Sequence, residues 1–153
     1  MGHNVHVDKP GEHLELLIGG DLYLAHRYAR AATNRALRAH RLDLRHFAVL
    51  GHLAEAGPTP QSALVGQLQM DKSSMVYVLD ELERQDLVNR RKDEHDRRRY
   101  AVHLTDEGRA RLAEVTRIAA QTMSKLLAPL SESDQHRLHA LLTRFIDHAA
   151  NET

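Results

Sequence analysis

Residues 71–108 read DKSSMVYVLDELERQDLVNRRKDEHDRRRYAVHLTDEG. Asp71 suits a helix N-cap, and the apolar residues after it recur at the spacing of a helix that is buried along one side. These residues are Met75, Val78, Leu79 and Leu82. Two β-prone segments, 87–92 and 100–104, then flank a charged turn over residues 93–99. The order predicts a helix followed by an arginine-rich hairpin, a shape that enters one DNA groove and contacts the next.

The residues before this stretch predict further helices. An apolar stripe from Glu12 to His40 is interrupted only by Gly19 and Gly20, which predicts one long helix that could kink there. Asp43 is a cap for a second helix, which residues 57–58 (Gly-Pro) end.

Residues 61–68 predict a short helix directly ahead of Asp71, so helix, tight turn and helix precede the hairpin. After the hairpin, Thr105 starts a long helix that reaches Pro129, and Ser131 opens a last one. The expected fold class is mainly α (α+β), a winged helix-turn-helix with a two-stranded β wing.

The first predicted helix and the last ones carry more apolar residues along one side than the core of one small winged-helix domain would bury. This excess of apolar surface predicts a homodimer interface. We expect a dimerisation helix over residues 1–40, a DNA-binding lobe over 41–111 and C-terminal dimerisation helices over 112–153, within one compact chain. The expected interface residues are Leu14, Leu17, Ile18, Leu138, Leu141, Leu142, Phe145 and Ile146.

Composition narrows the possible functions. The 153 residues suit one compact unit, and 21 Lys and Arg balance 21 Asp and Glu, so any DNA binding must depend on local charge placement. The absence of cysteine excludes disulfides, thiolate zinc sites and thiol redox sensing. The chain also lacks a Gly-rich phosphate loop and zincin spacing, so we expect no enzyme. No apolar run approaches the roughly 20 residues that span a membrane, and a cytoplasmic protein is expected.

Short motifs occur in a fixed order along the chain. They are Leu53-Ala54 to Gly57-Pro58, Gln61-Ser62-x-Leu64, Met70-Asp71-Lys72-Ser73-Ser74, Leu82-Glu83, Leu87-Val88, Asp96-x-Arg98 and Leu104-Thr105-x-x-Gly108. As a set, over residues 42–111, they resemble the MarR family of bacterial winged helix-turn-helix regulators. The resemblance implies a two-fold dimer that reads a pseudo-palindromic operator, and many such relatives are repressors that a small aromatic or anionic compound releases. Gln69 and Asp86 stand where relatives usually have glycine, which predicts slightly altered turns.

The candidate DNA contacts lie on the predicted reading helix and hairpin. Small or flat side chains at the start of a helix suit base edges, and the basic ones suit phosphate. We expect Ser73, Ser74, Val76 and Tyr77 to face bases, and Lys72, Arg84, Arg90, Arg97 and Arg99 to contribute positive charge. The resemblance implies that Arg98 enters the minor groove with Asp96 supporting it. The alternative is a solvated helix face and a strand edge guarded by charge.

A ligand site is a further hypothesis. Tyr23, His26 and Arg30 follow one another at helical spacing, and with His46 nearby they would form an aromatic and cationic cleft for an anionic aromatic effector. Ordinary helix packing is the alternative. No cofactor is expected to be required.

Two other regulatory functions stay open. Among 12 histidines, the pairs His3 with His6 and His136 with His139 lack a third ligand at metal spacing, so no metal site is expected, although a metal-responsive regulator remains an alternative. A winged-helix module that binds protein is another alternative, because the net charge is zero and Val76 with Tyr77 gives the helix a mildly apolar face.

Overall fold

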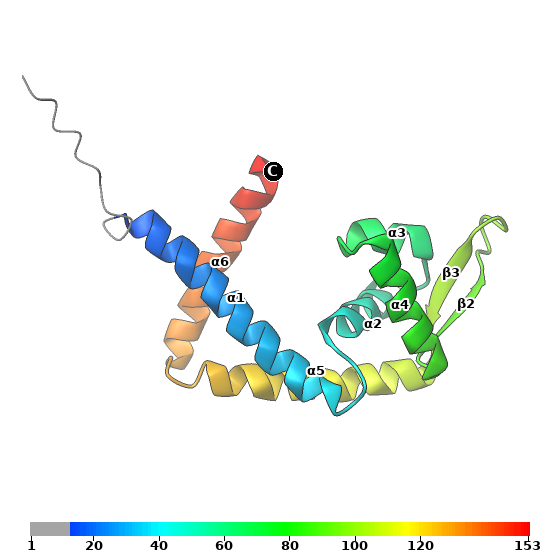
Figure 1. Cartoon of the computed structure of the whole chain (residues 1–153), viewed down its shortest axis with the longest axis horizontal. Helices are drawn as coiled ribbons and strands as arrows, with labels where there is room; N and C mark the ends of the chain where they lie inside the picture. Colours follow the sequence, from blue (N-terminus) through cyan, green and yellow to red (C-terminus); the bar gives the residue numbers. More distant parts are fainter. Residues whose placement is uncertain (1–12) are drawn as a thin grey trace, which may run out of the picture.

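The computed structural model describes residues 13–153, so His3 and His6 lie outside the described residues. Along the chain the elements are α1 Leu14–Arg38, α2 Leu44–Ala56, β1 Thr59–Pro60, α3 Gln61–Gln67, α4 Lys72–Arg84, β2 Val88–Lys92, β3 Tyr100–Leu104, α5 Asp106–Leu126 and α6 Glu132–Glu152 (Figure 1). The prediction of a mainly α winged helix-turn-helix is confirmed. The helix α1 runs without interruption through Gly19 and Gly20.

The sheet of the wing has three antiparallel strands in the order β1-β3-β2, so the prediction of a two-stranded wing was wrong. The extra strand β1 pairs Thr59 with Val102 and Pro60 with Ala101. A segment of two residues is too short to show the alternation of apolar and polar side chains that predicts a strand. In addition, Pro60 has no N–H to donate to a neighbouring strand. The strand exists because β3 passes beside this segment, which is a contact between residues about 40 positions apart.

The hydrophobic core lies inside the lobe that α2, α3, α4 and the three-stranded sheet form. The helix α4 contributes Met75, Val78, Leu79 and Leu82, all with no exposed surface, as the apolar spacing predicted. The helix α1 adds Leu37 near its C-terminal end and α5 adds Val115 from its middle, so both long helices are anchored in the lobe. Burial of this face leaves the opposite face of α4 at the surface.

The prediction of altered turns at Gln69 and Asp86 was wrong. Both residues adopt the left-handed conformation, with φ of 49° and 59°, in which glycine is more comfortable. Hydrogen bonds across each turn compensate for this cost: Met70 N donates to Val65 O at 3.2 Å, and Leu87 N donates to Leu82 O at 2.9 Å.

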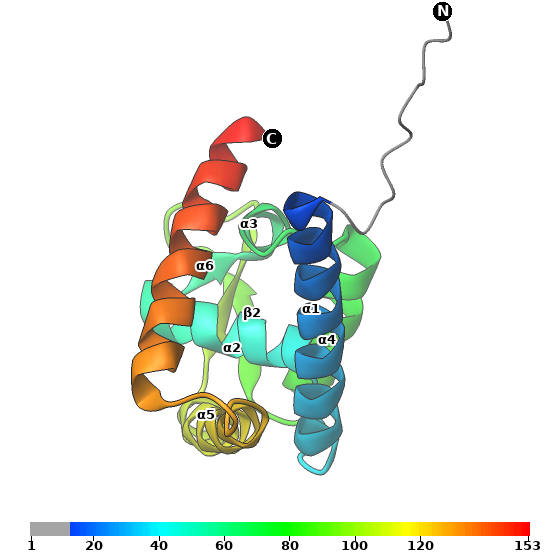
Figure 2. The same cartoon turned by 90° about the vertical axis from the view of Figure 1, so that its left-hand side faces the viewer.

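The long helices leave much apolar surface uncovered in the single chain. Figures 1 and 2 show α1 and α6 extending from α5 on the side away from the wing, and α6 has no buried residue. Of the eight predicted interface residues, Leu142 is partly buried, and the other seven are between 38% and 67% exposed. No helix within residues 13–153 is long and apolar enough to cross a membrane.

Candidate nucleic-acid interface

The N-terminus of α4 is capped by Asp71. Its Oδ1 accepts a hydrogen bond from Ser74 N at 2.8 Å, and its Oδ2 accepts one from Ser74 Oγ at 2.7 Å. The bond from Ser74 N is the largest cause that lowers the pKa of the Asp71 carboxyl. Because the Ser74 hydroxyl donates within the cap, it can offer a DNA base an acceptor and no further proton.

The outer face of α4 is open to a partner. Lys72 and Ser73 are exposed, while Val76 is 37% and Tyr77 54% exposed. The guanidinium of Arg45, in the first turn of α2, lies 5.6 Å from the centroid of the Tyr77 ring. Sequence reasoning missed Arg45, because only the packing of α2 beside α4 brings the two residues together.

The turn of the wing, residues 93–99, is ordered by its own side chains and backbone. Asp93 N donates to Arg99 O at 2.9 Å, and Asp96 Oδ1 accepts a hydrogen bond from Arg98 N at 3.0 Å. The same Oδ1 lies 3.4 Å from Arg98 Nε, while the Arg98 side chain is 93% exposed. The predicted pairing of Asp96 with Arg98 is therefore present, and the arginine projects into solvent at the tip.

The other two arginines of the turn differ in their surroundings. Arg99 lies 3.6 Å from Asp93 and 3.8 Å from Asp96, so its charge is partly compensated. A hydrogen bond from His95 N is the largest cause that lowers the pKa of Asp93, and the nearby Arg99 lowers it further. Arg97 forms no ion pair with any residue of the described part of the chain.

Arg90 has partners that the sequence did not reveal. Its Nη2 donates to Asp80 at 2.5 Å and its Nε donates to Glu83 at 2.8 Å, both on α4. These two carboxylates more than balance its charge, which does not favour the predicted contact of Arg90 with phosphate. The contacts instead fix the strand β2 against α4. Arg84 pairs with Glu81 at 2.5 Å but remains largely exposed.

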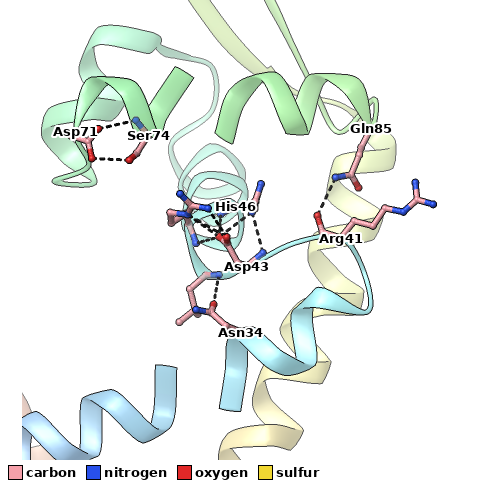
Figure 3. A network of polar contacts seen from close by, with 9 residues as sticks. Asn34, Arg41, Asp43, His46, Asp71, Ser74 and Gln85 are labelled. Atoms are coloured by element: carbon pink, nitrogen blue, oxygen red, sulfur yellow. Dashed lines mark hydrogen bonds and ion pairs between the residues drawn. The ribbon is translucent and has the colours of Figure 1, made fainter. Parts of the chain in front are cut away.

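The start of α2 holds a compact polar network (Figure 3). Asp43 Oδ1 accepts hydrogen bonds from Arg45 N at 2.8 Å and from His46 N at 3.5 Å. Asp43 N in turn donates to His46 Nδ1 at 3.0 Å, so Asp43 and His46 form a reciprocal cap. The side chain of Asn34 on α1 accepts a hydrogen bond from Leu44 N at 2.9 Å. The first turn of α2 is thus tied to α1.

The predicted effector residues do not meet in one open cleft. His46 is only 4% exposed and serves the α2 cap, whereas Tyr23, His26 and Arg30 are exposed on α1. His46 therefore has a structural role that the hypothesis did not foresee. A polar cavity of about 610 Å³ lies elsewhere, between the α1–α2 loop, the end of α4 and α5. Its lining is Ala39, His40, Arg41, Glu81, Arg84, Gln85, Arg111 and Glu114.

We predict that Asp43→Asn lowers the free energy of unfolding at pH 7 by about 1–2 kcal/mol. Burial raises the pKa of Asp43, but the hydrogen bonds from Arg45 and the positive charge of Arg45 contribute to a net lowering of the pKa from 3.8 to about 2. A lowered pKa in the folded state stabilises the fold above pH 4, and this contribution is lost as the pH falls towards 2.

Urea unfolding of the wild type and of Asp43→Asn between pH 7 and pH 2 measures this effect. The difference in the free energy of unfolding between the wild type and Asp43→Asn should become smaller below pH 4. Asp21→Asn, an exposed acid on α1, is the matched control and should change stability by less than about 0.5 kcal/mol. A difference that stays constant down to pH 2 would contradict the assignment.

Together the helix pair α3–α4 and the hairpin β2–β3 define the class: a winged helix-turn-helix DNA-binding protein. Residues 42–100 match the family model described as MarR family. The chain is 30% identical over 139 residues to the HTH-type transcriptional regulator PecS of Dickeya dadantii (strain 3937), covering 89% of this chain and 84% of that protein. This chain therefore belongs to the MarR family.

Other relatives agree with this assignment. The HTH-type transcriptional regulator MgrA of Staphylococcus aureus is 29% identical over 133 residues, covering 86% of this chain and 88% of that protein. A probable transcriptional regulator from Pseudomonas aeruginosa has a crystal structure with a TM-score of 0.74 and 34% identity, covering 84% of this chain and 96% of that one. The crystal structure of MarR, at 19% identity and a TM-score of 0.78 over 99% of this chain and 96% of that one, shows the shared fold. The chain is a DNA-binding transcriptional regulator and not an enzyme.

Proposed function

We propose that this chain binds a pseudo-palindromic DNA operator as a two-fold homodimer and represses transcription until a small ligand releases it. One arrangement supports the proposal most directly: the exposed face of α4 and the exposed Arg98 belong to two elements that Arg90 joins through Asp80 and Glu83. A rigid pair of this kind can occupy the major groove and the neighbouring minor groove together.

Within this proposal the residues have different tasks. Ser73, Val76 and Tyr77 reach base edges, and Lys72 at the positive end of α4 contacts phosphate. Arg98 enters the minor groove, where the negative potential is concentrated, and Asp96 orients it without compensating Arg97. The positive charge is thus local, which allows a chain of zero net charge to bind DNA.

Dimerisation is supported by the uncovered apolar stripes on α1 and α6. The stripe on α6 contains Leu141, Phe145 and Ile146, each more than half exposed in the single chain. A contiguous apolar patch of this kind is usually covered by a partner. A second copy would cover it and would set two reading helices about one turn of DNA apart.

Ligand release is supported more narrowly, by the exposed aromatic and cationic side chains Tyr23, His26 and Arg30 along one side of α1. A small aromatic acid fits such side chains by stacking and charge pairing. If benzoate binds there, it should raise the melting temperature of the wild type but not that of Arg30→Ala. Equal shifts in both proteins would exclude this location.

We predict that labelled duplex containing the operator binds with an affinity that falls steeply as salt rises, because binding releases counterions from several phosphates. Arg98→Ala should weaken binding and should reduce by about 1 the magnitude of the slope of log affinity against log salt concentration, which we call the salt slope. Tyr77→Ala should instead change the ranking of duplex sequences by roughly 1–3 kcal/mol. Fluorescence anisotropy at several salt concentrations measures both effects.

The control is Arg117→Ala, an exposed arginine on α5 outside the reading helix and the wing, which should bind like the wild type. If the affinity of the wild type for duplex does not change with salt, the alternative of a winged-helix module that binds protein is favoured instead. If Arg98→Ala and Tyr77→Ala both keep the wild-type affinity and the wild-type ranking of duplex sequences, neither residue contacts DNA as proposed.

A further inference from the structure

We propose that Arg45 on α2 is a positioning residue for Tyr77, and that it sets the base preference of the reading helix without itself contacting DNA. This inference rests on the proposed function, in which Tyr77 faces the bases. It assigns part of the operator specificity to a residue outside the helix-turn-helix.

The contact between the two side chains is the starting observation. The Arg45 guanidinium lies 5.6 Å from the centroid of the Tyr77 ring, which is within the range of a cation–π interaction. The ring is 54% exposed, so the core alone does not fix its direction. A guanidinium on one side of the ring restricts the directions in which the phenol can point.

Arg45 is suited to this task because it is itself held in place. Its Nη2 donates to Asp43 Oδ2 at 2.8 Å, and its Nε lies 3.2 Å from the same oxygen and 3.3 Å from Oδ1. These contacts use the edge of the planar guanidinium and leave its face for the tyrosine. An arginine without a carboxylate partner would sample many conformations and would orient nothing.

The carboxylate is anchored in turn. Asp43 caps α2 through Arg45 N, while the neighbouring Leu44 N donates to Asn34 on α1 (Figure 3). A continuous series of contacts therefore leads from the dimerisation helix, through the start of α2, to the reading helix. The direction of Tyr77 depends on how α1 meets α2.

Charge separates this role from that of a phosphate contact. Arg45 and Asp43 form a close pair that carries no net charge, so approach to DNA would release few counterions. Removal of Arg45 should then alter which sequences bind, with little change in the dependence of affinity on salt. An arginine that contacts phosphate would show the opposite behaviour.

The test uses the full-length protein and an operator selected from a random duplex library with the wild type. Arg45→Met keeps the aliphatic stem and removes the guanidinium, while Asp43 continues to cap the helix. Discrimination is the ratio of the affinities for two duplexes that differ at one base pair. We expect this ratio to fall about twofold to fivefold in Arg45→Met, which corresponds to the free energy of a weak cation–π contact. The affected base pair should be the one that Tyr77→Ala affects.

The double variant decides whether Arg45 acts through Tyr77. If it does, Arg45→Met adds no further loss in a Tyr77→Ala background, and the salt slope stays at the wild-type value. Arg45→Lys keeps the charge without the planar fork and should recover only part of the discrimination. Arg38→Met, an exposed arginine on α1, should keep all of it.

Each contrary outcome has a separate meaning. Wild-type discrimination in Arg45→Met, or an equal loss for all duplexes with a salt slope reduced by about 1, would overturn the positioning role while leaving the proposed function intact. A wild type without salt-dependent DNA binding would overturn both. Because Arg45→Lys retains charge near Asp43, it provides the same test if Arg45→Met does not fold.

Discussion

Phe145→Glu should convert the proposed dimer into a monomer and weaken operator binding about 100-fold or more. The Phe145 side chain is 52% exposed in the single chain and lies on an α6 stripe with no buried residue. In the proposed dimer a glutamate there would lose its hydration against apolar side chains, which costs several kcal/mol. A monomer reads only one half-site, so the gain from simultaneous binding of two half-sites disappears. Sedimentation equilibrium at micromolar concentration and duplex titration measure the two losses.

A glutamate on the opposite side of the same helix provides the control. Ala140→Glu adds the same charge at an exposed position of α6 away from the apolar stripe, and it should leave assembly and binding unchanged. Leu142→Glu, on the stripe, should behave like Phe145→Glu. A Phe145→Glu protein that remains dimeric and binds the operator would show that the interface lies elsewhere.

Gly108→Ala should destabilise the lobe by about 3 kcal/mol or more. An added Cβ at Gly108 would lie 2.0 Å from Leu87 O and 2.7 Å from Leu104 Cδ1. The carbonyl of Leu87 cannot easily move, because it accepts a hydrogen bond from Thr105 N at 3.1 Å just before α5 begins. The methyl group would therefore push α5 away from the start of the wing. The midpoint of urea unfolding measures the loss.

Gly51→Ala is the matched control, because nothing lies within 4 Å of the Cβ that it would add to α2. There the change should be neutral or stabilising by up to about 1 kcal/mol, since alanine favours a helix over glycine. Equal stability of the two variants would mean that α5 and the wing tolerate a shift at Gly108.

The local part of the fold could be predicted from the residues themselves. Asp71, Thr105 and Ser131 each accept a hydrogen bond at the helix start that their chemistry predicted. Such bonds join residues three positions apart, and the apolar face of α4 follows from a repeat within one helix. The motif order led to the MarR family for the same reason, because it records local turns and helix boundaries.

Contacts between distant segments could not be predicted in this way. The short strand β1 forms only against β3, and the two carboxylates that hold Arg90 lie on another element. The burial of His46 in a helix cap, where an open cleft was expected, depends on the packing around the start of α2.

The sequence by itself thus determined the helices, most of their caps and the exposed face of α4, since these depend on hydrogen bonds and side-chain spacing within a few residues. Only the tertiary structure decided which arginines remain available for DNA. Arg90 and Arg98 look alike in the sequence, yet one is paired with two carboxylates and the other is 93% exposed. Charge pairing depends on distance in space, and packing of the wing against α4 sets that distance.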